Sequence, residues 1–408
     1  MIDINYIREN PEKVKKGIEA KQLDPKRVDE VLELDKKRRE LLSEIETLRA
    51  DRNRVAKEQD KEKGKEIKTK LQKLEPELAK IEKEYKEKLY QIPNLPADDV
   101  KTGKDESENE VIREWGEKKK SSAKDYLELG EDLDIIDIKR AAKVSGSRFG
   151  YLKGDGALLE LALVQLAMEF LVKEGFTPVI PPSFIKRESM RGMGYLEHGG
   201  EEDMYVFEKD DLVLVGTSEQ SIGPMHMDEV LEEKNLPKRY VSFSPCFRRE
   251  AGSYGKDTKG ILRVHQFDKV EMFSFTKPGD SEKEHEYLLS LEEKFFQALE
   301  IPYQVVKMCS GDLGAPAAKK YDLEAWMPGQ GKYVEVTSTS NATDFQARRL
   351  NIKYQDKGET KFVHTLNGTA FAIGRTIIAI IENYQQKDGS ILIPDVLQKW
   401  VGKEKITK

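Results

Sequence analysis

Phe247-Arg248-Arg249-Glu250 and Arg263-Val264-His265-Gln266-Phe267 enclose a polar loop, and each has the pattern of a strand segment. The first ends an apolar run, and the loop, which extends to Gly260, is rich in glycine and lysine. Alternate residues of a strand face the same way. One face is therefore expected to carry Arg248 and Glu250 and, on the return strand, Arg263, His265, Phe267, Lys269 and Glu271.

These side chains suit a bound nucleotide. A guanidinium can hold a phosphate with two hydrogen bonds, a carboxylate can accept a hydrogen bond from an exocyclic amine, and an aromatic ring can stack on a base. A ladder of ion pairs between two strands would use the same residues, so both interpretations stand at this point.

The surrounding sequence predicts an α+β domain. Leu158 to Glu174 has a helical pattern, and several short β-branched runs follow one another without intervening helices. This order favours an antiparallel β-sheet core flanked by helices. The runs are 177–180, 212–215, 239–243, 269–275, 303–308 and 332–337.

Phosphate binding in this domain would depend on side chains. Neither Gly-x-Gly-x-x-Gly nor Gly-x-x-x-x-Gly-Lys-Ser/Thr occurs in the chain, and Gly252-Ser253-Tyr254-Gly255 has the wrong spacing for both. A third segment, residues 368–376, has the pattern of a glycine-rich turn leading into an apolar helix that contains Arg375. A single charge in so apolar a stretch must be paired or must hold a ligand.

The amino-terminal part of the chain predicts a long helical arm. Leu34, Leu41, Leu48 and Val55 recur every seven residues, and a second apolar series runs from Ile67 to Leu89. Residues 59–64 between them allow a reversal, so we expect an antiparallel coiled-coil hairpin over about Lys26–Gln91. Pro76 interrupts the second series and predicts a kink near Glu75. A short helix from Asn10-Pro11 to about Ala20 should precede the hairpin.

Prolines mark the end of this arm. Ile92-Pro93-Asn94-Leu95-Pro96 cannot continue a helix, and the residues up to Gly103 have the composition of a linker. We therefore expect two domains, 1–103 and 104–408.

Charge is distributed unevenly between the two parts. Residues 26–91 hold 20 Lys+Arg against 17 Asp+Glu, whereas the remainder holds 49 against 58. A basic arm could meet a polyanion, and a helix surface kept soluble by its own ion pairs is the alternative.

Composition excludes several classes of protein. The 408 residues are 38% hydrophobic and 35% charged, with a mean hydropathy of -0.66. No apolar run approaches the roughly 20 residues of a membrane helix, and the first residues resemble no targeting signal. We expect a cytoplasmic protein without a membrane span. Cys246 and Cys309 do not form a Cys-x-x-Cys pair, so neither a disulfide framework nor zinc is expected.

Taken together, these motifs resemble the three signature motifs of the class II aminoacyl-tRNA synthetases, and the resemblance narrows to the seryl-tRNA synthetase family. It covers almost the whole chain. The matching segments are the arm, 92–96, 103–109, 142–149, Pro178-Val179-Ile180-Pro181-Pro182, Phe247-Arg248-Arg249-Glu250, 263–271, 328–333, 344–349, Gly374-Arg375-Thr376 and 382–385.

This resemblance implies a class II antiparallel sheet and an ATP-dependent ligase. Such an enzyme activates L-serine to seryl-adenylate and transfers it to tRNA(Ser), and the family generally accepts tRNA(Sec) as well. The arm, residues 26–91, would bind the tRNA. The first motif implies a homodimer.

The resemblance also implies roles for individual residues. The serine pocket would be formed by Thr217, Ser218, Glu219, Arg248, Glu271, Asn367 and Thr369. ATP would be held by Arg248, Arg249, Glu250, Arg263, Val264, Phe267, Glu335, Val336, Thr337, Ser338 and Arg375. Within these sets, Arg248, Glu271 and Arg375 would be catalytic, and Glu335 and Ser338 would bind Mg²⁺ through hard oxygen atoms. A carboxylate is already a nucleophile, so His265 is expected to be structural rather than a general base.

Some positions depart from the family pattern. Ser218 replaces an alanine, residues 220–226 lack the expected side chains, and Arg249 and Thr339 replace a serine and a cysteine. Thr369 stands where a serine is typical. Its extra methyl group should tighten the pocket and sharpen the rejection of threonine, since one methylene is worth about 1 to 3 kcal/mol.

Two other functions stand beside the synthetase interpretation. A catalytically idle paralogue would keep the fold and the arm as a binding module, but it should have lost some of the charged residues named above. A ligase that loads an amino acid onto a carrier protein resembles the same body without the arm, and residues 26–91 argue against it.

Overall fold

A computed structural model describes residues 1–119, 124–197, 200–251 and 259–408. The Gly252-Ser253-Tyr254-Gly255 segment lies outside these residues. The chain divides into two compact units, Met1–Leu95 and Pro96–Lys408. Within the described residues no helix is both long enough and apolar enough to cross a membrane.

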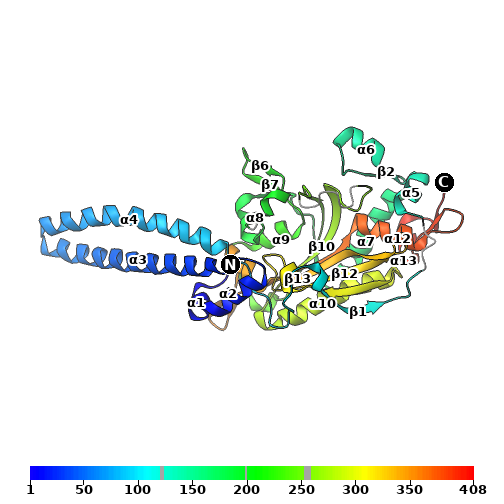
Figure 1. Cartoon of the computed structure of the whole chain (residues 1–408). Coiled ribbons are helices and arrows are strands. Elements are labelled where there is room, and N and C mark those ends of the chain that lie inside the picture. Colours follow the sequence, from blue (N-terminus) through cyan, green and yellow to red (C-terminus); the bar gives the residue numbers. More distant parts are fainter. Residues whose placement is uncertain (120–123, 198–199, 252–258) are drawn as a thin grey trace. The chain divides into compact units, whose positions relative to one another are not determined.

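The first unit is a helical hairpin on a small helical base (Figure 1). Helices α1 (Ile4–Glu9) and α2 (Pro11–Ala20) form the base, and α3 (Lys26–Glu58) and α4 (Lys61–Tyr90) form the hairpin. The predicted hairpin and the predicted helix after Asn10 are confirmed. The reversal is shorter than expected, because α4 begins at Lys61 and includes Gly64. The helix also continues through Pro76, and the predicted kink stays a prediction.

An acidic residue lies at a buried position of the hairpin. Val31, Ile45 and Val55 of α3 are buried as their spacing predicts, whereas the heptad residues Leu34, Leu41 and Leu48 are half-buried. Asp35 is buried among the apolar residues. Its carboxylate accepts hydrogen bonds from Nε and Nη2 of Arg8, both at 2.7 Å, and from Nε of Arg39 at 3.0 Å. The charge is therefore compensated inside the first unit.

The second unit is built on one large sheet. Its order is β1-β11-β12-β13-β16-β10-β9-β4, and its pairs are antiparallel except for β4 with β9. The predicted antiparallel core is thus confirmed. The strands are β1 (Glu110–Trp115), β4 (Thr177–Val179), β9 (Lys238–Phe247), β10 (Gln266–Thr276), β11 (Tyr303–Lys307), β12 (Lys319–Met327), β13 (Lys332–Asn341) and β16 (His364–Ala372).

Helices and small sheets surround this core. Helices α7 (Asp155–Lys173), α10 (Ser281–Ala298) and α12 (Ile373–Tyr384) pack against the large sheet, and α13 (Asp395–Val401) packs against α7. The other helices are α5 (Tyr126–Asp132), α6 (Ile138–Ser145), α8 (Arg187–Met193), α9 (Glu219–Ile222) and α11 (Phe345–Leu350). The short strands are β2 (Ile136–Asp137), β3 (Tyr151–Leu152), β5 (Phe184–Lys186), β6 (Val206–Phe207), β7 (Leu212–Leu214), β8 (Val230–Glu232), β14 (Lys353–Asp356), β15 (Glu359–Phe362), β17 (Ile391–Leu392) and β18 (Lys405–Ile406).

Two expectations about the strands were wrong. Residues 368–372 are not a turn but the end of β16, a central strand between β13 and β10. A Cβ atom at position 368 would lie 2.9 Å from Oε1 of Glu292 on α10, so a larger residue there would displace that carboxylate. β9 ends at Phe247 and the return strand β10 begins at Gln266. Arg248 and Glu250 therefore follow the first strand, and Arg263 and His265 precede the second, rather than alternating along them.

Residues 96–103, which were predicted as a linker, are bound to the rest of the second unit by hydrogen bonds and ion pairs. The N–H of Ala97 donates to the carbonyl of Ala318 at 2.9 Å, and the N–H of Gly311 donates to the carbonyl of Gly103 at 3.0 Å. Asp99 contacts Lys307 and Lys319 at 2.7 and 2.8 Å. Residues 96–103 therefore belong to the second unit.

Candidate active site

Two adjoining pockets open along β10, β13 and β16. Six of the residues that line the first are charged: Arg248, Glu250, Arg263, Lys269, Glu335 and Arg375. The second is lined by Thr217, Glu219, Glu271 and Asn367 among others. Arg248, Lys269 and Ser338 line both. Two basic side chains, Arg248 and Lys269, therefore lie where the pockets meet.

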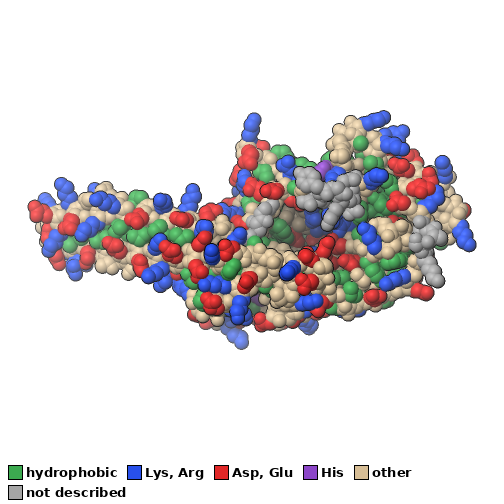
Figure 2. Space-filling view, in the orientation of Figure 1, with side chains coloured by type: hydrophobic (Ala, Val, Ile, Leu, Met, Phe, Trp, Pro, Cys, Tyr) green, Lys and Arg blue, Asp and Glu red, His purple; other side chains and the backbone are tan. Residues whose placement is uncertain are grey.

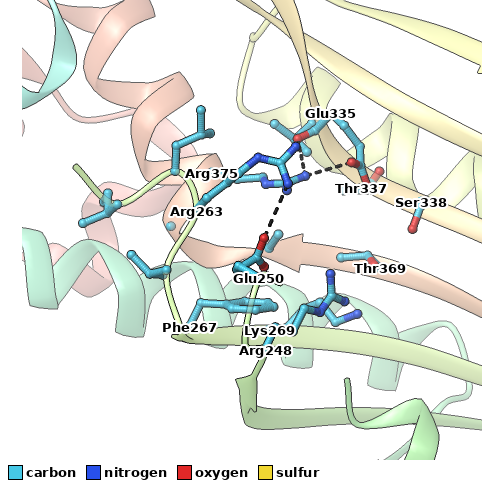
Figure 3. Close-up of a pocket in the computed structure, with 16 residues that line it drawn as sticks. Arg248, Glu250, Arg263, Phe267, Lys269, Glu335, Thr337, Ser338, Thr369 and Arg375 are labelled. Carbon is cyan, nitrogen blue, oxygen red and sulfur yellow. Dashed lines mark hydrogen bonds and ion pairs between the residues drawn. The ribbon is translucent and has the colours of Figure 1, made fainter. Parts of the chain in front are cut away.

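The first pocket contains two arginine–carboxylate pairs (Figure 3). Nη1 of Arg263 lies 3.5 Å from Oε2 of Glu250, and Nη1 of Arg375 lies 3.0 Å from Oε2 of Glu335. The guanidinium of Arg248 lies 5.3 Å from the ring centre of Phe267. The first pocket thus combines cations, carboxylates and an aromatic ring. These groups suit a ligand that is both anionic and aromatic.

Glu335 is held ionised in this pocket. Burial opposes its charge, but the neighbouring cations Arg375 and Lys320 lower the pKa of Glu335 to about 2. Glu335 and Ser338 both come from β13 and present a carboxylate and a hydroxyl to the same pocket. Within the described residues no cluster of three or more His, Cys, Asp or Glu could hold a metal ion by protein ligands alone.

The second pocket holds two buried carboxylates, Glu219 and Glu271, among acidic and basic side chains in equal number. The strand register pairs Glu271 of β10 with Thr369 of β16, and Oγ1 of Thr369 donates to Oε2 of Glu271 at 3.2 Å. Nζ of Lys269 lies 2.5 Å from Oε2 of the same carboxylate. Burial and the charge of Glu271 raise the pKa of Glu219 to about 7. These buried carboxylates and the Thr369 hydroxyl suit a small ligand that carries an ammonium group and a hydroxyl.

Comparisons with known proteins agree along the whole chain. Residues 1–96 match the seryl-tRNA synthetase N-terminal domain, and residues 205–384 match the class II tRNA synthetase core domain of the G, H, P, S and T enzymes. The serine–tRNA ligase of Dictyoglomus thermophilum is 51% identical over 98% of both chains. The chain belongs to the seryl-tRNA synthetase family.

Solved structures of the family have the same fold. The seryl-tRNA synthetase of Pyrococcus horikoshii, complexed with ATP, is 45% identical to this chain and has a TM-score of 0.94. The match covers 100% of this chain and 99% of that protein. The cytoplasmic serine–tRNA ligase of Naegleria fowleri, in complex with AMP, is 35% identical with a TM-score of 0.91, at coverages of 100% and 99%.

Most of the residues predicted for the synthetase site line the two pockets. Those in the first are Arg248, Glu250, Arg263, Val264, Phe267, Glu335, Val336, Thr337, Ser338, Thr369 and Arg375, and those in the second are Thr217, Glu219, Arg248, Glu271, Ser338 and Asn367. Thr369, which was predicted for the serine pocket, thus lines the first pocket and reaches the second only through its hydrogen bond to Glu271. Thr337 contributes differently from its neighbours, because its Oγ1 donates to Glu292 of α10 at 2.7 Å.

Two predicted residues of the synthetase site face elsewhere. The hydroxyl of Ser218 lies 2.7 Å from that of Ser242, in the core beneath the pocket. Arg249 does not line either pocket; its guanidinium lies 5.9 Å from the ring centre of Tyr205. Neither side chain has a ligand-facing position.

His265 has the structural position that we expected. Its Nδ1 atom lies 3.0 Å from the carbonyl of Arg248, and the N–H of Arg248 donates to the carbonyl of His265, also at 3.0 Å. The histidine thereby fixes the main chain that carries Arg248.

Sequence reasoning gave no individual role to several residues that line the pockets, among them Lys269, Lys320 and Tyr195. Lys269 lies on β10 on the predicted face beside Glu271, but no role was assigned to it. Lys320 comes from the neighbouring strand β12, and Tyr195 follows α8. The alternation of Lys269 with Glu271 could have revealed the first, whereas only the fold brings the other two to the pocket.

Proposed function

We propose that this chain is an ATP-dependent, AMP-forming serine–tRNA ligase. It activates L-serine to seryl-adenylate and transfers the seryl group to tRNA(Ser). The observation that supports this best is the position of Arg248, which lines both the pocket suited to a nucleotide and the pocket suited to an amino acid. One guanidinium can therefore contact both substrates at the bond that forms.

The first pocket is the proposed ATP site. Phe267 stacks on the adenine ring, Glu250 accepts a hydrogen bond from its amino group, and Arg263 and Arg375 hold the outer phosphates. Both arginines already lie against carboxylates, at 3.5 and 3.0 Å, so they are preorganised for binding. Electrostatic preorganisation of this kind is a main source of catalysis.

Mg²⁺ fits the donor set of the same pocket. Glu335 offers a carboxylate that stays ionised, and Ser338 offers a hydroxyl, both hard oxygen donors. When bound, the ion would neutralise phosphate charge. Arg375 shares Glu335 with the proposed ion.

The second pocket is the proposed serine site. Glu219 and Glu271 accept the ammonium group, and Arg248 holds the carboxylate. Asn367 lines the side-chain end, and Thr369 donates to Glu271 from the first pocket. An oxygen of the serine carboxylate attacks the α-phosphorus of ATP, and pyrophosphate leaves. Positioning and charge neutralisation are sufficient for this step because the carboxylate needs no activating base.

In the second step, the terminal ribose hydroxyl of the tRNA attacks the carbonyl carbon of the adenylate, and AMP leaves. Recognition of tRNA(Ser) belongs to the helical arm, and charging of tRNA(Sec) is part of the same proposal. Lys and Arg side chains are interspersed with acidic ones along the arm (Figure 2). Such a surface suits contacts with an RNA backbone, so affinity should depend on salt.

A homodimer is the proposed assembly. The single chain exposes large apolar side chains on α7 and just after β4, among them Leu161 at 62% and Ile180 at 76% of their surface. Exposed apolar groups of this size favour association with a partner, here a second copy. We further propose a cytoplasmic location.

The two other functions are disfavoured by particular residues. An idle paralogue has no need to keep Arg248, Glu250, Glu271, Glu335 and Arg375, which all line the two pockets. A ligase for a carrier protein has no use for α3 and α4.

The experiment is ATP-dependent attachment of labelled serine to a tRNA(Ser) transcript by the full chain and by a variant in which a short turn replaces residues 40–79. We expect charging by the full chain and a loss of at least about tenfold in the variant, with serine-dependent pyrophosphate exchange retained. A full chain that activates serine but charges no tRNA would contradict the proposal, as would a shortened chain that charges tRNA equally well.

A further inference from the structure

The two carboxylates of the amino-acid pocket are held by different partners. Glu271 is bonded to Lys269, with Nζ and Oε2 2.5 Å apart. Glu219 is instead bonded by the phenolic hydroxyl of Tyr195, which donates to its Oε1 atom. Glu219 and Glu271 are 4% and 1% exposed, so both charges lie in a largely dehydrated wall.

The main chain next to Tyr195 is fastened to a neighbouring helix. Gly194 caps α8 in the left-handed region, at φ +88°, and a Cβ atom there would lie 2.9 Å from the ring of Phe345. The side chain of Gln346 on α11 donates to the carbonyl of Met193 at 3.2 Å. The phenol therefore projects from a fixed turn.

Arg349 makes two further contacts with this segment, one before and one after Tyr195 in the sequence. Nη1 of Arg349, also on α11, donates to the carbonyl of Arg191 at 3.1 Å and to Oε2 of Glu197 at 3.0 Å. The segment is thus held to α11 on both sides of the tyrosine, which lines the pocket.

We propose that Tyr195 is a positioning residue for amino-acid recognition, whose hydroxyl holds the Glu219 carboxylate as the acceptor of the substrate's ammonium group. This inference rests on the proposed function of the second pocket. It adds a residue to that pocket that neither the motifs nor the spacing of the sequence indicates.

Electrostatics explains why Glu219 needs such a partner. Burial and the charge of Glu271 raise the pKa of Glu219 to about 7, whereas Lys269, the hydroxyl of Tyr195 and Arg248 act in the opposite direction. These groups face Glu219 from β10, from the turn after α8 and from the segment after β9. Burial and the charge of Glu219 raise the pKa of Tyr195 well above its ordinary value, so the phenol remains a donor at neutral pH.

The variant Tyr195→Phe removes the hydroxyl and keeps the ring. The pKa of Glu219 should then rise further, so that more of it is protonated near pH 7 and unable to bind an ammonium group. A hydrogen bond to a charged group contributes about tenfold to a hundredfold in affinity. The KM for serine should rise by about that factor at pH 7, with kcat and the KM for ATP nearly unchanged.

The pH profile separates this role from a merely structural one. The ratio of serine KM values, variant over wild type, should fall as the pH is raised from 6.5 to 9, because Glu219 becomes ionised in both proteins. Ionisation of the free serine amine affects both equally and cancels in the ratio. A ratio near one at every pH, or an equal rise in the KM for ATP, would overturn the inference.

Tyr287→Phe is the matched control. The Tyr287 hydroxyl donates to Oε2 of Glu174 at 2.8 Å, a bond of the same kind outside both pockets. This control should lower the melting temperature about as much as Tyr195→Phe does but leave the serine KM unchanged. If Tyr195→Phe proves too unstable to assay, the wild-type serine KM must still rise as the pH falls below about 7, and a KM that is flat between pH 6 and 8 would overturn the inference.

A double-mutant cycle tests whether Tyr195 acts through Glu219. In a Glu219→Gln background, Tyr195→Phe should add little further loss, because the residue that it positions is already neutral. Losses that multiply independently would contradict the inference. Serine-dependent pyrophosphate exchange by the wild type comes first: its absence removes the proposed function, whereas its presence with an unaffected Tyr195→Phe variant removes this inference alone.

Discussion

Nη1 of Arg375 bonds Glu335 twice, at 3.0 Å to the carboxylate Oε2 and at 2.9 Å to the main-chain carbonyl. The first contact compensates charge, and the second fixes the guanidinium relative to β13. Arg375 lies in the first turn of the apolar helix α12, and Glu335 is the partner that a charge in so apolar a segment requires. An arginine held in this way can accept phosphate oxygens without reorganising.

Replacement of Arg375 should therefore impair ATP use more than protein stability. For Arg375→Gln we expect a loss of about a hundredfold to a thousandfold in kcat/KM for ATP in serine-dependent pyrophosphate exchange. Arg140→Gln, which removes an exposed arginine paired with Asp137, is the control and should retain full activity. Equal activities of the two variants would contradict the proposed role of Arg375.

Thr369→Ser should make room for one methyl group beside Glu271 of the amino-acid pocket. Threonine should then be activated more readily relative to serine, by about tenfold, because a methyl group contributes about 1 to 3 kcal/mol to such discrimination. The measurement is the ratio of kcat/KM values for the two amino acids in pyrophosphate exchange. Thr365→Ser, on the same strand but bonded to Gln346, is the matched control. An unchanged ratio for Thr369→Ser would show that its methyl group does not border the substrate.

The buried Asp35 should stabilise the helical hairpin. Burial opposes its charge, but hydrogen bonds from Arg8 and Arg39 lower the pKa of Asp35 below its ordinary value. Asp35→Ala leaves these arginines without their acceptor and should destabilise the arm by about 3 kcal/mol. Circular dichroism during thermal unfolding of the full chain would measure the loss, with Asp29→Ala, an exposed partner of Lys15, as the control. Equal melting of both variants would be inconsistent with this prediction.

Asp99 predicts an acid-dependent contribution to stability. Partial burial acts the other way, but hydrogen bonds from Lys307 and Lys319 lower the pKa of Asp99 to about 2. A carboxyl with a depressed pKa stabilises the folded state above its unfolded pKa of about 4, and this contribution disappears as the pH falls towards 2. Asp99→Asn should lower the melting temperature at pH 7 by an amount that shrinks between pH 4 and pH 2.

The neighbouring Asp98→Asn makes the same change of charge and is the control for that series. Because Asp99 is about half exposed, the expected loss at pH 7 is about 1 kcal/mol or less. A difference between wild type and Asp99→Asn that stays constant from pH 7 to pH 2 would refute the assignment.

Periodic features of the sequence predicted much of this fold. The heptad repeat of residues 31–55 predicted a long helix, and α3 contains it. The alternation of Lys269 and Glu271 predicted that both lie on one face of a strand, and both line the second pocket. The arginines and carboxylates of the first pocket were also predicted, because their local patterns belong to recognisable motifs.

Contacts between distant segments could not be predicted in the same way. Residues 368–372 look like a turn because of Gly368, yet this glycine lies in a strand, where Oε1 of Glu292 on α10 is 2.9 Å from the position that a Cβ atom would take. Ser218 shares a motif with two pocket residues, but the short helix that begins after it turns its hydroxyl towards Ser242. Tyr195 reaches the pocket only through packing against α11.

The central claim is that two pockets joined at Arg248 bind ATP and serine for one reaction. Amino-acid-dependent exchange of labelled pyrophosphate into ATP tests it most directly, with each of the twenty amino acids and without tRNA. We predict exchange with serine and its loss by at least about a hundredfold in Arg248→Gln. Exchange that requires another amino acid, or serine-dependent exchange that survives Arg248→Gln unchanged, would contradict the claim.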